Sequence, residues 1–136
     1  MDKNDIAKEW FRFAEMDLAS AEHLTHNMNP PPLEIICFHC QQSAEKKLKG
    51  LMVLHDEYPP KIHDLLGLLK ICGEIYVDLY QLSNKCNFLN KYSVAPRYPD
   101  EIQITDDDVK LCLRYANDIN EFVKELVESI NIQNEI

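Results

Sequence analysis

The sequence has little glycine, few arginines and no long apolar run. Only three of its 136 residues are glycine, and no glycine-rich phosphate loop is present. With 14 lysines and arginines against 23 acidic residues, the net charge is −9, which excludes a protein that coats nucleic acid through clustered basic residues. No apolar stretch approaches the roughly 20 residues that span a bilayer, and the N-terminus lacks the apolar segment of a secretion signal. We therefore expect a cytoplasmic protein that has no contact with a membrane.

The five cysteines are odd in number and stand among apolar residues, which favours reduced core thiols over a disulfide framework. Cys37 and Cys40 form a Cys-x-x-Cys pair with His39 between them. Because no second close pair of ligands follows, core packing is the favoured interpretation, and zinc or redox chemistry is the alternative. We expect no metal and no cofactor beyond the nucleotide ligand considered below.

Hydrophobic periodicity predicts helices and no strands. The first expected helix is capped by Asn4 or Asp5 and runs to about Thr25. Four more are expected over about 33–57, 62–72, 75–91 and 105–130. Thr105 followed by Asp108 is a capping-box pattern for the last of them. The sequence therefore predicts a single all-α domain over residues 1–136, an antiparallel up-and-down four-helix bundle with one additional short helix. Residues 131–136 are expected to fray.

Three polar residues fall where apolar side chains are expected. In the segment 33–57, Gln41 lies within the apolar stripe and Glu45 at its edge, while Asp17 lies near the centre of the first helix's stripe. That first stripe consists of Ile6, Trp10, Phe13, Ala14, Ala21 and Leu24. An unpaired buried polar group costs about 1–3 kcal/mol, so each of the three needs a partner. Asp17 is either hydrogen-bonded to a neighbouring helix or part of one buried polar cluster with Gln41 and Glu45.

A second set of residues has the chemistry to hold a phosphate. The candidates, from the polar face of the central helix and from two later segments, are Gln42, Lys46, Lys49, His63, Tyr92, Arg97 and Tyr98. Arg97 stands between two tyrosines in a proline-bounded loop, so its guanidinium suits a planar anion such as phosphate or, alternatively, a carboxylate of the same protein. His63 either titrates near neutrality or makes a structural hydrogen bond that holds its turn.

Four blocks of the sequence together resemble the HEPN domain family. They are the run Phe38–Lys49, His63-Asp64-Leu65, Tyr92 with Arg97-Tyr98-Pro99-Asp100, and the first-helix residues Trp10, Ala14, Asp17, Leu18 and Ala21. The resemblance implies a helical up-and-down bundle that is usually a homodimer, in a small prokaryotic protein often encoded beside a minimal nucleotidyltransferase. It also implies nucleotide binding, and several branches of the family are metal-independent toxin RNases.

The RNase branches share an arginine followed after four to six residues by a histidine. None of the three arginines here, Arg12, Arg97 and Arg114, has a histidine at that spacing. Losing the acid/base group usually lowers the activity of an RNase by orders of magnitude. The first hypothesis is therefore a binding module that takes a nucleotide and pairs with a nucleotidyltransferase. A toxin-like RNase that uses Arg97 and His63 on RNA is the second. A purely structural helical adaptor is the third, in which the polar cluster only ties helices together.

Overall fold

A computed structural model describes residues 2–94 and 103–135, with side chains as far as Asn131. These residues form five α-helices and one 3-10 turn, with no strand among them: α1 (Lys3–Asn27), α2 (Leu33–Leu54), α3 (Leu65–Gly73), η1 (Val77–Leu82), α4 (Ser83–Asn90) and α5 (Asp106–Glu135). The all-α prediction is confirmed. Within this part of the chain, no helix is both long enough and apolar enough to cross a membrane.

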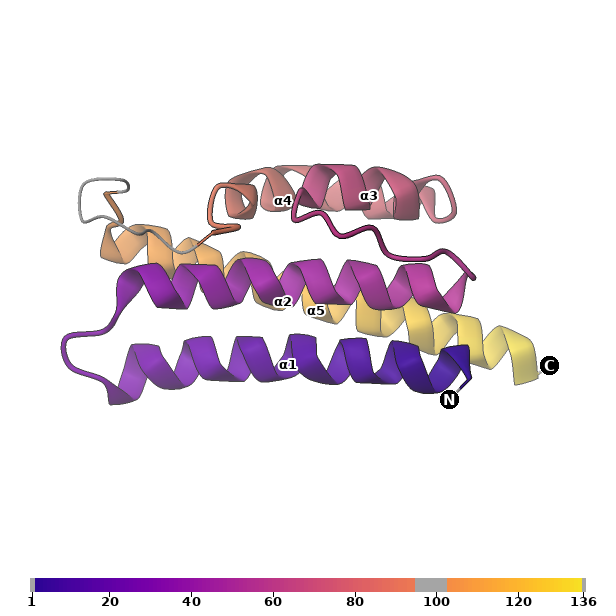
Figure 1. Cartoon of the computed structure of the whole chain (residues 1–136), viewed down its shortest axis with the longest axis horizontal. Coiled ribbons are helices and arrows are strands. Elements are labelled where there is room, and N and C mark those ends of the chain that lie inside the picture. Colours follow the sequence, from indigo (N-terminus) through magenta and orange to yellow (C-terminus); the bar gives the residue numbers. More distant parts are fainter. Residues whose placement is uncertain (1, 95–102, 136) are drawn as a thin grey trace.

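Helix α2 lies at the centre of the bundle. Figure 1 shows α1 running antiparallel beside it, α5 crossing behind it, and α3 and α4 covering its other side. Along the chain α1, α2, α4 and α5 alternate in direction, and α3 is the additional short helix. Because α2 contacts all four other helices, most of its residues are buried, including the polar ones discussed below.

All five cysteines lie in the core as free thiols, as the sequence predicted. Burial raises the pKa of Cys72 and of Cys86 to about 12, so both thiols stay protonated near pH 7. A protonated thiol is neither a nucleophile nor a metal ligand. Cys37 and Cys40 are fully buried as well, which supports core packing for the Cys-x-x-Cys pair.

Two helix starts differ in how well the sequence predicted them. The capping box of α5 is confirmed, because Asp108 N donates to Thr105 Oγ1 over 3.1 Å and Thr105 N donates to Asp108 Oδ2 over 3.0 Å. The cap of α1 is Asp2 instead of Asn4 or Asp5, since its side chain accepts from Asp5 N. An acidic cap three residues before an amide satisfies a donor that the helix leaves unpaired.

Three other boundaries were predicted wrongly. Helix α3 begins only at Leu65, because Asp64 caps it and places His63 outside the helix. The predicted helix over 75–91 is a 3-10 turn followed by the eight-residue α4. Helix α5 continues to Glu135 instead of fraying after Ile130. In each case the apolar period located the element, but caps and tertiary contacts decided where it ends.

The face that α1 turns to the core also differs from the prediction. Ala7, Ala14 and Ala21 are fully buried, whereas Ile6 is 40% exposed and Phe13 is 45% exposed. Alanines seven residues apart let α1 approach α2 closely, so the two backbones meet along the small side chains. The larger residues of the predicted stripe are therefore turned toward the edge of that contact.

Candidate functional site

The buried carboxylate of Glu45 is the centre of a group of polar side chains from α2 and from the segment before α3. Its Oε1 accepts hydrogen bonds from Gln41 Nε2 at 3.3 Å and from His63 Nδ1 at 2.9 Å, and its Oε2 pairs with Lys49 Nζ at 3.2 Å. The side chains of Glu45 and Lys49 are only 5% and 7% exposed. We call these four residues the Glu45 cluster. Its bonds compensate for the cost of burying a carboxylate and an ammonium group.

Asp17 belongs to a second group, which joins α1 to α2. Its Oδ1 accepts from His39 Nδ1 at 2.9 Å and its Oδ2 pairs with Lys46 Nζ at 2.5 Å. We call these three residues the Asp17 cluster. The hydrogen bonds described for Asp17 do not join it to Gln41 or Glu45, so the single buried cluster proposed from the sequence divides into two. The alternative interpretation of Asp17, a carboxylate bonded to a neighbouring helix, describes it better.

Both clusters hold a histidine in a defined orientation. A carboxylate can only accept, so the neutral ring must carry its proton on Nδ1 and present Nε2 as an acceptor. The side chain of His63 is 58% exposed and that of His39 is 28% exposed, so both rings reach the surface. The arrangement supplies two oriented hydrogen-bonding groups with accessible edges.

The lysines among the predicted phosphate-binding residues are less available to a ligand than the sequence suggested. Lys46 and Lys49 each pair with a carboxylate, and Lys49 also lies 5.9 Å from the centre of the Trp10 ring. Gln42 donates to the side-chain oxygen of Gln41 at 2.8 Å. Two positive and two negative side chains leave the site close to neutral. Hydrogen bonding, more than net charge, is what this surface offers a ligand.

Of the predicted phosphate-binding aromatic residues, the structure describes Tyr92, and it places this ring in the core. Tyr92 is only 3% exposed, and it packs in the core near Phe88 and Cys112. Burial, with the nearby Cys112 and Asp108, raises the pKa of its phenol. Tyr92 is therefore a core residue, because apolar neighbours surround the ring. Arg97 and Tyr98 lie outside the described residues.

Two contributors to this region were not identified from the sequence. His39 was considered only as part of the Cys-x-x-Cys pair, yet its spacing of seven residues from Lys46 places both on one side of α2. Asn120 of α5 donates to Ser43 Oγ and to Ala116 O, both at 2.8 Å, and Ser43 Oγ donates to Ala14 O at 2.6 Å. These bonds tie α1, α2 and α5 together. Asn120 stands four residues after Ala116 and three before Val123, both buried, and this helical spacing is the signal that could have identified it.

No group of three histidine, cysteine, aspartate or glutamate side chains in the described part of the chain is arranged to hold a metal ion. The fold and the site together define a small all-α domain whose central helix contributes to two carboxylate-centred clusters, each of which orients a histidine. Residues 7–126 match the model of the HEPN domain. The chain belongs to the HEPN family.

Two solved structures are similar to the whole domain. TT1696 from Thermus thermophilus is 28% identical, with a TM-score of 0.67, over 88% of this chain and 96% of that protein. ST0689, an archaeal HEPN homologue, is 26% identical, with a TM-score of 0.68, over 89% of this chain and 97% of its own. No curated protein matches the sequence.

Proposed function

We propose that this protein is a cytoplasmic HEPN binding module: a homodimer that takes a nucleotide or another phosphate-bearing ligand and pairs with a minimal nucleotidyltransferase. The observation that carries the proposal is the outer face of α1. Ile6, Trp10 and Phe13 have the spacing of a buried helical stripe, yet Ile6 and Phe13 are 40% and 45% exposed. A stripe of this kind that the monomer leaves in water is typical of a surface that a partner covers.

The apolar surface extends from α1 to the segment that follows α2. A hollow of about 500 Å³ is lined by Ile6, Trp10, Val53 and the run Tyr58–Pro60, together with charged residues at its rim. Tyr58 is 84% exposed, which is unusual for a large aromatic side chain. Tryptophan and tyrosine are the residues that most often dominate the binding energy of protein interfaces. This surface supports the dimer as part of the proposal.

Replacing Phe13 with glutamate is expected to convert the dimer into a monomer. The new carboxylate would be desolvated against the apolar surface of the second copy, which costs several kcal/mol when no cation pairs with it, and so weakens association by about a hundredfold or more. The mass in solution is measured by light scattering during size-exclusion chromatography. Val77→Glu is the matched control, because Val77 is 73% exposed and belongs to η1, outside the α1 stripe. A wild-type protein that is monomeric at high concentration would contradict the dimer.

Nucleotide binding is supported by the exposed edge of His63, which Glu45 holds in one orientation, and by the neighbouring amide of Gln42. Calorimetry with ATP and GTP is expected to show saturable binding. His63→Ala and Arg97→Ala should each weaken it about tenfold, the value of one hydrogen bond to a charged group. His26→Ala, an exposed histidine at the end of α1, should leave it unchanged.

Two further results decide between the binding module and its alternatives. RNA incubated with the protein should remain intact on a sizing gel, because no arginine in the sequence has a histidine four to six residues after it. Cleavage of RNA that persists in His26→Ala but not in His63→Ala would favour the RNase instead. No heat with any nucleotide at millimolar concentration would leave the helical adaptor as the remaining hypothesis.

The pairing with a nucleotidyltransferase is supported by family membership, and co-elution with such a protein encoded next to this one tests it.

A further inference from the structure

A hollow between α1 and α5 has buried polar groups at its floor that neither cluster uses. It encloses about 270 Å³, and we call it the α1–α5 hollow. The charged and amide side chains that matter in its lining come from α1, α2 and α5: Glu15, Glu22, Lys47, Asn120, Glu121 and Lys124. Lys47 and Asn120 are buried and the other four are exposed. The buried pair therefore forms the floor, and the exposed residues form the walls.

The side-chain amide of Asn120 is satisfied at one end only. Its Nδ2 donates to Ser43 Oγ and to Ala116 O, both at 2.8 Å. Its Oδ1 is buried and accepts no hydrogen bond from the part of the chain that the structure describes. The reverse orientation would set the amide oxygen against Ala116 O, so the neighbours require this one. A buried acceptor without a donor destabilises the fold, and a donor that enters the hollow removes that cost.

The ammonium group of Lys47 is also incompletely compensated. Its side chain is 3% exposed, and it pairs over 3.3 Å with Glu15, whose side chain is 60% exposed. That contact uses one of the three donors of the ammonium group. Burial lowers the pKa of Lys47, and Glu15 offsets only part of this effect. Lys47 thus has donors available for an anion in the hollow.

The two floor groups lie close to each other and ask for opposite charges. Asn120 meets α2 at Ser43, and Lys47 is four residues further along α2, where side chains of one helix face are about 5–6 Å apart at Cβ. The unsatisfied acceptor, with the carboxylates of Glu22 and Glu121 above it, suits an ammonium group. The buried ammonium group suits a carboxylate. A ligand with a single charge satisfies only half of the floor.

We infer that the α1–α5 hollow binds a small zwitterion of the α-amino-acid class, with its carboxylate at Lys47 and its ammonium group at Asn120 Oδ1 and Glu121. The two charged groups of such a molecule are a few bonds apart, which matches the short separation of the floor groups. The hollow is smaller than the roughly 300–1,000 Å³ typical of sites for drug-sized ligands, so the ligand has few atoms.

This site goes beyond the proposed function and does not depend on it. At about 100° per residue, Glu15 and Glu22 lie on the side of α1 opposite to Ile6 and Phe13. A second copy that covers the α1 stripe therefore leaves the hollow open. His63, which the proposed nucleotide surface uses, is not part of the lining.

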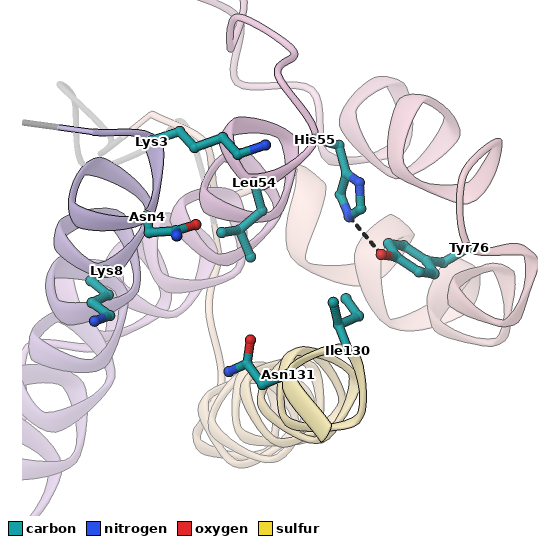
Figure 2. A pocket seen from close by; sticks show the side chains of 8 residues that line it. All are labelled: Lys3, Asn4, Lys8, Leu54, His55, Tyr76, Ile130 and Asn131. Carbon is teal, nitrogen blue, oxygen red and sulfur yellow. Dashed lines mark hydrogen bonds between the residues drawn. The ribbon is translucent and has the colours of Figure 1, made fainter. Parts of the chain in front are cut away.

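The test is a titration of ¹⁵N-labelled protein followed by NMR, with glycine as the zwitterion and with acetate and methylammonium as its two halves, at equal ionic strength. We expect saturable shifts of the Asn120 side-chain amide, with glycine binding at least about tenfold more tightly than either half. The side-chain amides of Asn4 and Asn131, which lie at another pocket at the end of the bundle (Figure 2), are the reference in the same spectra and should not shift.

Three variants test the part played by Lys47. Lys47→Met should weaken glycine binding about tenfold or more, whereas Lys110→Met, at an exposed position of α5, should change it less than about twofold. Glu15→Gln should tighten it about threefold, because it removes the exposed competitor for Lys47. Lys47→Met should still fold, since the carboxylate that it leaves without a partner is in water.

Four outcomes would overturn the inference. They are no saturable shift at Asn120, equal shifts at all three asparagines, acetate or methylammonium binding as tightly as glycine, and unchanged glycine binding in Lys47→Met. If Lys47→Met does not fold, Glu15→Gln decides, because weaker glycine binding in that variant also contradicts the site. Nucleotide heat without a glycine shift at Asn120 would overturn this site and leave the proposed function standing. A glycine shift without nucleotide heat would do the reverse.

Discussion

Replacing Glu45 with alanine is expected to lower the free energy of unfolding by about 3–5 kcal/mol, the largest effect of any single substitution considered for this protein. The substitution leaves the ammonium group of Lys49, 7% exposed, without its carboxylate. It also removes the acceptor of His63 Nδ1 and one of the two acceptors of Gln41 Nε2, which still donates to His63 O. Urea denaturation followed by circular dichroism measures the change. If any of the protein remains folded, His63 should lose its fixed orientation, which the chemical shifts of its ring would report.

The matched control is Glu9→Ala, which removes a carboxylate from the exposed pair with Arg12. Surface pairs contribute about 0–1 kcal/mol, so this variant should be nearly as stable as the wild type. A double variant, Glu45→Leu with Lys49→Met, should recover most of the stability, because buried ion pairs can often be exchanged for apolar side chains of similar volume. Equal losses in Glu45→Ala and Glu9→Ala would show that the Glu45 cluster is open to water.

Replacing Gly50 with alanine is expected to destabilise the protein by about 1–2 kcal/mol, although the same change in an exposed helix would stabilise it by about 1 kcal/mol. A Cβ at this position would lie 2.5 Å from Cε1 of Phe11 and 3.0 Å from Cβ of Trp10. Both contacts belong to α1, so α1 and α2 would have to move apart along the surface where they pack most extensively. Thermal and urea unfolding measure the sign of the change.

Gly67→Ala provides the comparison for this prediction. A Cβ there would lie 3.1 Å from Oδ2 of Asp64, while the capping bond to Leu66 N is made by Oδ1. The aspartate side chain can shift, so the gain in helix propensity should dominate and the variant should be unchanged or slightly more stable. If Gly50→Ala were also stabilising, the contact between the two helices would be looser than the glycine implies. Phe11→Leu combined with Gly50→Ala should restore part of the loss, because the ring then no longer fills the space.

The sequence was most informative about features that depend on neighbours along the chain. The reciprocal capping bonds of Thr105 and Asp108 were predicted because they join residues three apart at a helix start. The burial of Gln41 and Glu45 was predicted because the helical period places them on the core side of α2. Both inferences require only the geometry of one helix.

Pairings between helices could not be obtained in the same way. Asp17 contacts His39 and Lys46, which follow it by 22 and 29 residues, and the helical period alone does not choose between these partners and Gln41 or Glu45. The choice depends on how far α1 is rotated and shifted along α2. That rotation follows from Ala7, Ala14 and Ala21, whose small side chains allow the closest approach.

The sequence by itself determined the class of fold, the centrality of the α2 segment, the reduced cysteines in the core and the family. These follow from composition, from the period of apolar residues and from short blocks of residues, all of which are local. Only the tertiary structure decided that Tyr92 is buried, that Lys46 and Lys49 are neutralised by acids, and that Ile6 and Phe13 face outward. The physical reason is that burial and charge pairing depend on which helix faces meet, and the meeting of faces is decided by the packing of the whole bundle.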